Sequence, residues 1–176
     1  MSSDSIDEEA RISEERLSDQ AAEIICGSIR ELAGLKPTVI ALPRSATVAD
    51  AVDAMIENKM GAVLIVEDGQ LFGLFTERDI LTRVVAAERV PSQTPITEVM
   101  TTSPECLSFD DEIVFALNRM TVGGFRHVPI LDENGVPTTV VSMRDVVEHI
   151  VSFYSNEVFN LPSSPGEGAF SHREGA

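Results

Sequence analysis

Two short segments pair an alcohol with a carboxylate three residues further on. The segment GLFTERDI contains Thr76 and Asp79, and the segment TVVSMRDV contains Ser142 and Asp145. Each pair follows an apolar run and opens a stretch with helical periodicity. A hydroxyl and free amides at a helix N-terminus hold phosphate, and a carboxylate nearby accepts hydrogen bonds from ribose hydroxyls, as in dinucleotide folds. This chemistry suits a nucleotide.

The same spacing has a simpler interpretation as helix capping. A Ser or Thr followed three residues later by an acid resembles a capping box, although Glu or Gln is preferred to Asp at the acidic position. Capping and binding are compatible, because a ligand can use groups that cap the empty helix. The recurrence of the pair at two strand-to-helix junctions favours a binding role.

The elements expected around the first pair form a compact series. They are a short apolar segment over 38–42, a helix over 47–58, strands over 62–66 and 70–75, and a helix over 76–87. The helix assignments rest on apolar residues at helical spacing, and the strands on short apolar runs separated by a turn.

The second pair lies in a repetition of this series. Its elements are an apolar segment over 105–109, a helix over 111–120, strands over 126–131 and 136–141, and a helix over 142–154. The apolar positions of the two copies correspond, and so do the two alcohol–acid pairs. An internal duplication predicts two lobes related by a pseudo-twofold axis.

These patterns divide the chain into five segments. We expect a disordered acidic N-terminus over 1–15, a leading helix over 16–35, a first repeat over 36–90, a second repeat over 91–155, and a flexible tail over 156–176. Acidic composition and few apolar residues are typical of disorder at the start. Gly, Pro and Ser are typical of a tail at the end.

Composition restricts the partners and the location. The chain has 176 residues and a formal net charge of −16. This charge argues against nucleic acid and anionic membranes as partners, because phosphate backbones recruit clustered Lys and Arg. No apolar run approaches the roughly 20 residues that span a bilayer, and no secretion signal is visible. We therefore expect a cytoplasmic protein. The negative net charge does not exclude a small anionic ligand, because a helix N-terminus supplies local positive potential.

The doubled pattern resembles a tandem cystathionine-beta-synthase (CBS) domain pair, also called a Bateman module. The resemblance rests on the repeated G-x-x-T/S-x-x-D motif, on the segment 46–80 that contains its first copy, and on ITEVMT (96–101), which leads into the second copy. It covers roughly residues 25–155. It implies an α/β (α+β) fold in which two β-α-β-β-α units pack through their sheets as a pseudo-twofold pair.

The resemblance also implies ligands and assembly. The two clefts of such pairs take adenosine-containing ligands, namely AMP, ADP or ATP, and sometimes NAD or S-adenosylmethionine. By this resemblance Thr76 would contact phosphate and Asp79 the ribose of the first cleft. Ser142 and Asp145 would do the same in the second cleft. Such pairs usually dimerise through their helices into a flat disc, which predicts a homodimer.

Basic residues near the two motifs are further candidates for phosphate binding. Arg78 and Arg144 lie inside the motifs, although first-turn arginines often face solvent. Arg126 and His127 resemble a family feature in which basic residues at the start of a strand point at phosphate, and a solvated strand entrance is the alternative. Their counterparts at 61–62 are uncharged, so we expect the two clefts to differ.

The second motif departs from the pattern. Gly73 begins the first motif and would let backbone and ligand approach closely. Thr139 stands in its place in the second, with Pro137 upstream. A β-branched side chain there could narrow the second cleft, so the Thr76 cleft is the better candidate.

No catalytic or metal-binding pattern is visible. The histidines, His127, His149 and His172, show no metal-ligand spacing, and His149 is expected on a helix surface. Cys26 and Cys106 give no disulfide framework, and no nucleophile elbow or phosphate-binding loop occurs.

The sequence therefore predicts a non-catalytic regulatory module. It would bind an adenosine nucleotide between its repeats and signal to an unidentified effector protein by conformational change. Two alternatives stay open. One is a dimeric interaction scaffold with degenerate ligand sites, and the other is an enzyme acting on a nucleotide, which would need an acid/base pair or a metal cluster.

Overall fold

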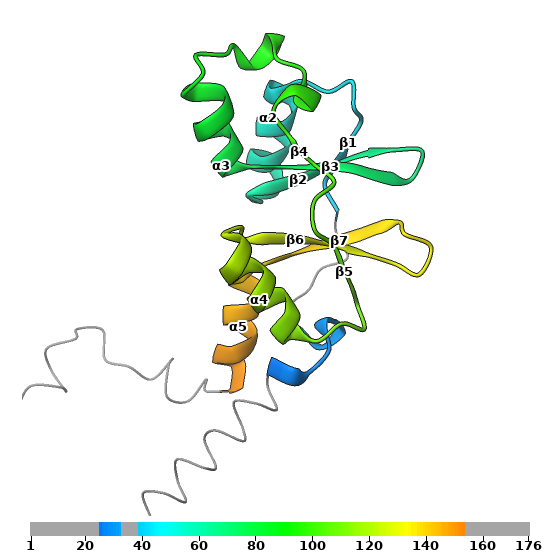
Figure 1. Ribbon diagram of the computed structural model, residues 1–176. Coiled ribbons are helices and arrows are strands. Elements are labelled where there is room, and N and C mark those ends of the chain that lie inside the picture. The colour runs from blue at the N-terminus through cyan, green and yellow to red at the C-terminus, as the bar shows by residue number, and fades with distance from the viewer. Residues whose placement is uncertain (1–24, 33–38, 154–176) are drawn as a thin grey trace, which may run out of the picture.

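A computed structural model describes residues 25–32 and 39–153 (Figure 1). The predicted acidic segment over 1–15 and the predicted tail over 156–176 lie outside the described residues. Within them, the chain forms two lobes with separate sheets, each covered by helices on its outer side.

The first repeat contains a four-stranded sheet in the order β1-β2-β3-β4. Strand β1 is parallel to β2, and the other neighbours are antiparallel. The elements are β1 (Ala41–Leu42), α2 (Val48–Asn58), β2 (Ala62–Glu67), β3 (Gln70–Thr76), α3 (Glu77–Asp79), η2 (Ile80–Val85), η3 (Pro91–Gln93), η4 (Ile96–Glu98) and β4 (Thr101–Thr102). The short strand β4, on the segment that leads into the second repeat, was not predicted.

The second repeat reproduces this plan with a three-stranded sheet in the order β5-β6-β7. Its elements are β5 (Leu107–Ser108), α4 (Ile113–Gly123), β6 (His127–Leu131), β7 (Pro137–Ser142) and α5 (Met143–Phe153). Strand β5 is parallel to β6, as β1 is to β2, and β6 and β7 form the hairpin. The α/β (α+β) fold is therefore confirmed.

The helix α2 illustrates why these segments fold as they do. Thr47 caps it, because its hydroxyl oxygen accepts from the Asp50 amide at 3.3 Å while the Thr47 amide donates to the Asp50 carboxylate at 2.8 Å. Val48, Ala51 and Met55 are buried on one face, which is the spacing of an apolar helical stripe. The helix thereby covers one face of the first sheet and leaves the other face free.

The free faces of the two sheets lie against each other (Figure 1). Ala62, Leu64 and Leu74 from the first repeat form one buried cluster with Val140 from the second. Each repeat also has a larger buried cluster, which lies between its sheet and the helices that cover it. The molecule is thus layered as helices, sheet, sheet and helices, and the sheet-to-sheet contact sets the relative position of the repeats.

The helix expected over 76–87 is only partly regular. After the single turn of α3, the segment η2 is a π-helix, in which the Ala86 amide donates to the Leu81 carbonyl at 3.0 Å. Its counterpart in the second repeat, α5, is an ordinary α-helix over eleven residues. Single π-turns are rare and occur frequently at functional sites.

The predicted leading helix over 16–35 is wrong in its described part. Ile25 and Cys26 are helical, and the 3₁₀ turn η1 (Ile29–Glu31) follows after a bend at Gly27. The Ile29 amide donates to the Asp111 carbonyl and the Ile113 amide to the Gly27 carbonyl, both at 2.8 Å. The segment 27–32 therefore docks on the second repeat, not the first.

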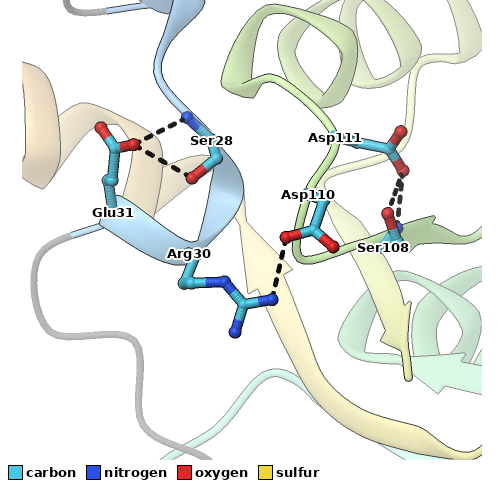
Figure 2. A network of polar contacts seen from close by, with 6 residues as sticks. All are labelled: Ser28, Arg30, Glu31, Ser108, Asp110 and Asp111. Atoms are coloured by element: carbon cyan, nitrogen blue, oxygen red, sulfur yellow. Dashed lines mark hydrogen bonds and ion pairs between the residues drawn. The ribbon is translucent and has the colours of Figure 1, made fainter. Parts of the chain in front are cut away.

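Side chains strengthen this docking. Figure 2 shows the Arg30 guanidinium donating to the Asp110 carboxylate at 2.9 Å, beside the Ser28–Glu31 pair that caps η1. Arg30 also stacks over the Phe109 ring. Ile29 is fully buried in the core of the second repeat.

The first repeat receives an equivalent contact from the segment 91–99. The Val48 amide donates to the Thr94 carbonyl and the Ile96 amide to the Ala46 carbonyl, both at 3.0 Å. Ile96 is fully buried in the core of the first repeat. The segment that leads into each repeat thus closes the core of the other repeat, which ties the two lobes together.

Replacing Ile29 with Ala should lower the free energy of unfolding by about 2–5 kcal/mol, because it leaves a cavity in the core of the second repeat. Urea unfolding measures this. Ile56→Ala is the matched control, since Ile56 is 70% exposed, and it should change stability by about 0.5 kcal/mol or less. Equal effects of the two substitutions would contradict the docking of the segment 27–32.

Candidate functional site

A cleft of about 370 Å³ lies between the two repeats, within the usual size range of small-molecule sites. Three parts of the chain line it: the end of β3 with the turn that follows, the segment that leads into the second repeat, and the start of β6. The lining residues are Leu74, Thr76, Glu77, Arg78, Asp79, Arg83, Thr101, Ser103, Pro104, Glu105, Phe125, Arg126 and His127.

The first alcohol–acid pair lies in this cleft and caps α3. The Thr76 amide and hydroxyl donate to Asp79 Oδ2 at 2.9 and 2.7 Å. The other carboxylate oxygen, Oδ1, lies 3.3 Å from Arg83 Nε. Asp79 is 7% exposed. Each carboxylate oxygen accepts two hydrogen bonds, so Oδ1 keeps capacity for a ligand donor while Oδ2 is saturated by the cap.

The second pair has the same local geometry but is not part of this lining. The Ser142 amide and hydroxyl donate to Asp145 Oδ2 at 2.6 and 2.7 Å. The Arg144 side chain is 84% exposed and pairs with Glu148 at 2.7 Å. Ser142, Arg144 and Asp145 are thus absent from the lining of the cleft, although Ser142 is paired with His127 across β6 and β7.

Spacing alone does not identify a binding residue in this chain. The pairs Thr47–Asp50 and Ser108–Asp111 have the same three-residue separation and make the same amide and hydroxyl contacts. Neither pair lies in the lining of the cleft. Helix capping, or a local turn in the case of Ser108–Asp111, therefore explains the spacing in all four cases, and only the position in the cleft distinguishes Thr76 and Asp79.

The arginines of the cleft differ in how they are engaged. The Arg78 guanidinium donates to the Gly124 carbonyl at the C-terminus of α4, which links the two repeats. Arg83 contacts Asp79 and also donates to the Val99 carbonyl at 2.9 Å. The exposed guanidinium of Arg126 makes no hydrogen bond or ion pair with the residues that the structure describes. Arg126 is therefore the uncommitted cation of the cleft.

His127 lies among several of these charges. Burial, and then the positive charge of Arg126, hold the pKa of the His127 imidazole below its ordinary value. The carboxylates of Glu77 and Asp145 oppose this shift, and Arg78 adds to it. The lowered pKa favours the neutral form of the imidazole.

The two junctions differ in charge as the sequence predicts. The positions equivalent to Arg126 and His127 in the first repeat are Gly61 and Ala62. Backbone contacts confirm the correspondence, because the Gly61 carbonyl accepts from the Glu77 amide as the Arg126 carbonyl accepts from the Met143 amide. The cations at the start of β6 have no counterpart at the start of β2.

Gly73 in the first repeat corresponds to Thr139 in the second, and packing within each repeat, not access of a ligand, explains this difference. A Cβ on Gly73 would lie 2.5 Å from the Met100 sulfur and 3.0 Å from the Thr101 carbonyl oxygen, so the glycine admits β4. Thr139 is 2% exposed and, by strand alternation, lies on the same face as Val141, toward the helices. The expectation that Thr139 narrows a cleft is wrong.

The expected position of His149 is also wrong. His149 is 5% exposed and packs edge-on against the Phe153 ring at 5.1 Å. It occupies the position that Arg83 has in the first repeat, four residues after the motif aspartate.

Sequence reasoning missed several residues of the cleft. Arg83 follows Asp79 by four residues, which is the spacing of an ion pair on a helix and a usable signal. Glu77 lies inside the first motif, GLFTERDI, and was not predicted as a site residue. The segment from Thr101 to Glu105 gave no signal, because only the folded chain brings it beside the first motif.

Comparison with known proteins identifies the family. A family model for the CBS domain matches residues 29–86 and 96–152. The chain belongs to the CBS-domain family. Each matched region covers most of one repeat and begins inside the docked segment, 27–32 or 91–99, that precedes it. The predicted resemblance is therefore confirmed.

Relatives of the CBS-domain pair include longer proteins. A CBS domain-containing protein of Arabidopsis thaliana is 34% identical over 109 residues, which are 62% of this chain and 20% of that protein. The chain thus spans about a fifth of the length of this curated relative. A CBS-domain containing protein from Agrobacterium tumefaciens has a similar structure, with a TM-score of 0.63 and 28% identity over 69% of this chain and 98% of that one.

A further solved structure shares the fold. A CBS domain protein from Pyrobaculum aerophilum, complexed with AMP, has a TM-score of 0.64 and 24% identity over 73% of this chain and 99% of that one. Within residues 25–32 and 39–153, no helix of the present chain is long and apolar enough to cross a membrane.

The environment of His127 gives a test of the cleft. Its imidazole should titrate in an NMR experiment below the ordinary value of 6.5. Its contribution to stability is then complete above pH 6.5 and is lost as the pH falls, because the unfolded chain binds the proton more readily. Arg126→Gln should raise the pKa of His127 by removing a neighbouring positive charge. Arg144→Gln should leave it unchanged, and an equal response to both substitutions would contradict the geometry.

Proposed function

We propose that this CBS-domain pair is a non-catalytic regulatory module that binds one adenosine nucleotide in the cleft between its repeats. The observation that carries the proposal is the meeting of the Thr76–Asp79 junction of one repeat with the uncommitted Arg126 of the other in one cleft. The AMP complex of the Pyrobaculum protein, which has the same fold, supports an adenosine ligand.

Each residue of the cleft has a chemically distinct task in this proposal. The Arg126 guanidinium and the Thr76 hydroxyl hold the phosphate, and the neutral His127 imidazole adds a hydrogen bond. The hydroxyl has a single hydrogen, which turns from Asp79 Oδ2 to the phosphate when the ligand binds. The Asp79 Oδ1 atom accepts from the ribose hydroxyls, which places the sugar beside the α3 turn. The segment 101–105 forms the wall against which the adenine packs.

The Ser142–Asp145 junction is proposed as the weaker site. Its motif cation, Arg144, is paired with Glu148 and largely exposed. The positions of the first repeat that correspond to Arg126 and His127 are the uncharged Gly61 and Ala62. A phosphate there would meet fewer positive charges, so one nucleotide per chain is expected.

Transmission of the bound state needs an element that differs between two states, because a ligand shifts only equilibria in which it binds one state better. We propose the contact of Arg78 with the Gly124 carbonyl as that element, since it joins the cleft to the end of α4. A bound phosphate competes for Arg78 and loosens this contact between the repeats.

The output is proposed to pass to another chain. Leu81 and Val85 on η2 and Val147 and Phe153 on α5 are large apolar residues that are 49–65% exposed. Exposed apolar groups of this kind mark association surfaces when they gather on one face. They are the proposed contacts of a homodimer, which would present the nucleotide-dependent change to an effector protein.

Calorimetric titration with AMP, together with a thermal-shift series over ADP, ATP, NADH and S-adenosylmethionine, tests the function. A ligand at a hundred times its dissociation constant adds about 2.7 kcal/mol to the free energy of unfolding. At least one adenosine compound should give a gain of this order. The absence of any gain would favour the scaffold, and turnover of the nucleotide would favour an enzyme.

Paired substitutions locate the working cleft. Asp79→Asn and Arg126→Gln should each weaken binding about tenfold or more, because hydrogen bonds to charged groups contribute about 1.5–3 kcal/mol. Asp145→Asn and Arg144→Gln are their counterparts in the second junction and should leave the affinity within about threefold. If only Asp145→Asn and Arg144→Gln lost binding, the nucleotide would bind at the second junction, and the proposed location of the site would be wrong.

A further inference from the structure

One carboxylate of the cleft lacks a cationic partner. Of the three acids in the lining, Asp79 pairs with Arg83 at 3.3 Å and Glu105 with Arg119 at 2.8 Å. The Glu77 carboxylate makes no ion pair or side-chain hydrogen bond with the residues that the structure describes. Its negative charge therefore acts on the cleft without local compensation.

Glu77 is held close to the proposed phosphate position. It follows Thr76 directly, and its amide donates to the Gly61 carbonyl at 3.1 Å. Its carboxylate lies against the Gly61 backbone, because a Cβ built on Gly61 would be 3.1 Å from Glu77 Oε2. The His127 imidazole is influenced by Glu77 as well as by Arg126, which places both charges around one part of the cleft.

The first repeat has an acidic residue, Glu77, at a position where the second repeat has none. Met143 occupies the same position in the second repeat, where its amide donates to the Arg126 carbonyl at 2.9 Å. The backbone geometry of the two repeats is thus conserved at this position while the charge is not. A capping role does not require Glu77, because the Ser142–Asp145 cap forms beside Met143 with the same contacts.

The charges available to an anion are few. Arg83 is held by Asp79 and the Val99 carbonyl, and Arg78 by the Gly124 carbonyl. Arg126 remains as the cation ready for a ligand. Together with Arg78, once that residue is released from the Gly124 carbonyl, it compensates the negative charge of one phosphate group. Any further phosphate extends into the field of Glu77, and the described lining holds no third unpaired cation to offset it.

We propose that Glu77 sets the number of phosphates, so that the cleft binds a nucleoside monophosphate in preference to the corresponding di- or triphosphate. This inference rests on the proposed nucleotide function and specifies its ligand class. A carboxylate about 6 Å from an added phosphate charge, at an effective dielectric constant of about 40, disfavours the longer ligand by about tenfold. The module then responds to the monophosphate even when triphosphate is abundant.

The test is calorimetric titration of AMP and of ATP, without magnesium, into the wild-type chain, Glu77→Gln and Glu57→Gln. Glu57→Gln removes the same charge from the exposed face of α2, outside the cleft. The wild type and Glu57→Gln should bind AMP at least tenfold more tightly than ATP. Glu77→Gln should reduce this preference about tenfold, mainly by strengthening the binding of ATP.

Salt provides a second measurement. Exposed charges are screened within about 8 Å at 0.15 M salt and more strongly above it, so raising the salt concentration should reduce the AMP preference of the wild type more than that of Glu77→Gln. An unchanged ratio of AMP to ATP affinity in Glu77→Gln would overturn the inference and leave the proposed function intact. Failure of the wild type to bind either nucleotide would overturn the proposed function, and the inference with it.

Discussion

The contact between the two sheets determines most of what this molecule can do. Ala62, Leu64 and Leu74 of the first repeat bury their side chains against Val140 of the second. Burial of apolar surface is not directional, so this contact alone would leave the orientation of the repeats loosely defined. The segments 27–32 and 91–99 fix the orientation of the repeats. Each precedes one repeat in the chain and is hydrogen-bonded to the other.

This arrangement explains why a cleft forms where it does. The end of β3 and the start of β6 belong to different repeats, and packing of the sheets brings them to the same edge. Thr76 and Asp79 arrive from one side, and Arg126 and His127 from the other. A single repeat would carry a capped helix with no cation opposite it, so the site is a property of the pair.

The two repeats have kept their backbone contacts and changed their charges. Equivalent caps form at Thr76 and Ser142, and equivalent amide contacts form at Gly61 and Arg126. The side chains around them differ in charge, with Glu77 opposite Met143 in the alignment of the repeats and Arg83 opposite His149. Duplication therefore supplied two similar junctions, and substitution made them chemically distinct.

The duplication and the α/β (α+β) fold could be predicted from the sequence, because the apolar spacing of α2 and α4 is local and recurs. The site could be predicted only in part. The spacing of Thr76 and Asp79 is shared with Thr47–Asp50, a cap outside the cleft, so spacing could not separate binding from capping. The docking of the segment 27–32 on the second repeat and the strand β4 depend on contacts between residues far apart in the chain, which periodicity does not report.

The central claim is that the two repeats jointly hold one nucleotide at the Thr76 junction. A crystal structure of the chain grown with AMP tests it most directly. The account predicts electron density for one AMP in this cleft, with phosphate oxygens about 3 Å from Thr76 Oγ1 and the Arg126 guanidinium and ribose hydroxyls at Asp79 Oδ1. Density for AMP only beside Ser142 and Asp145, or an empty cleft at saturating AMP, would contradict it.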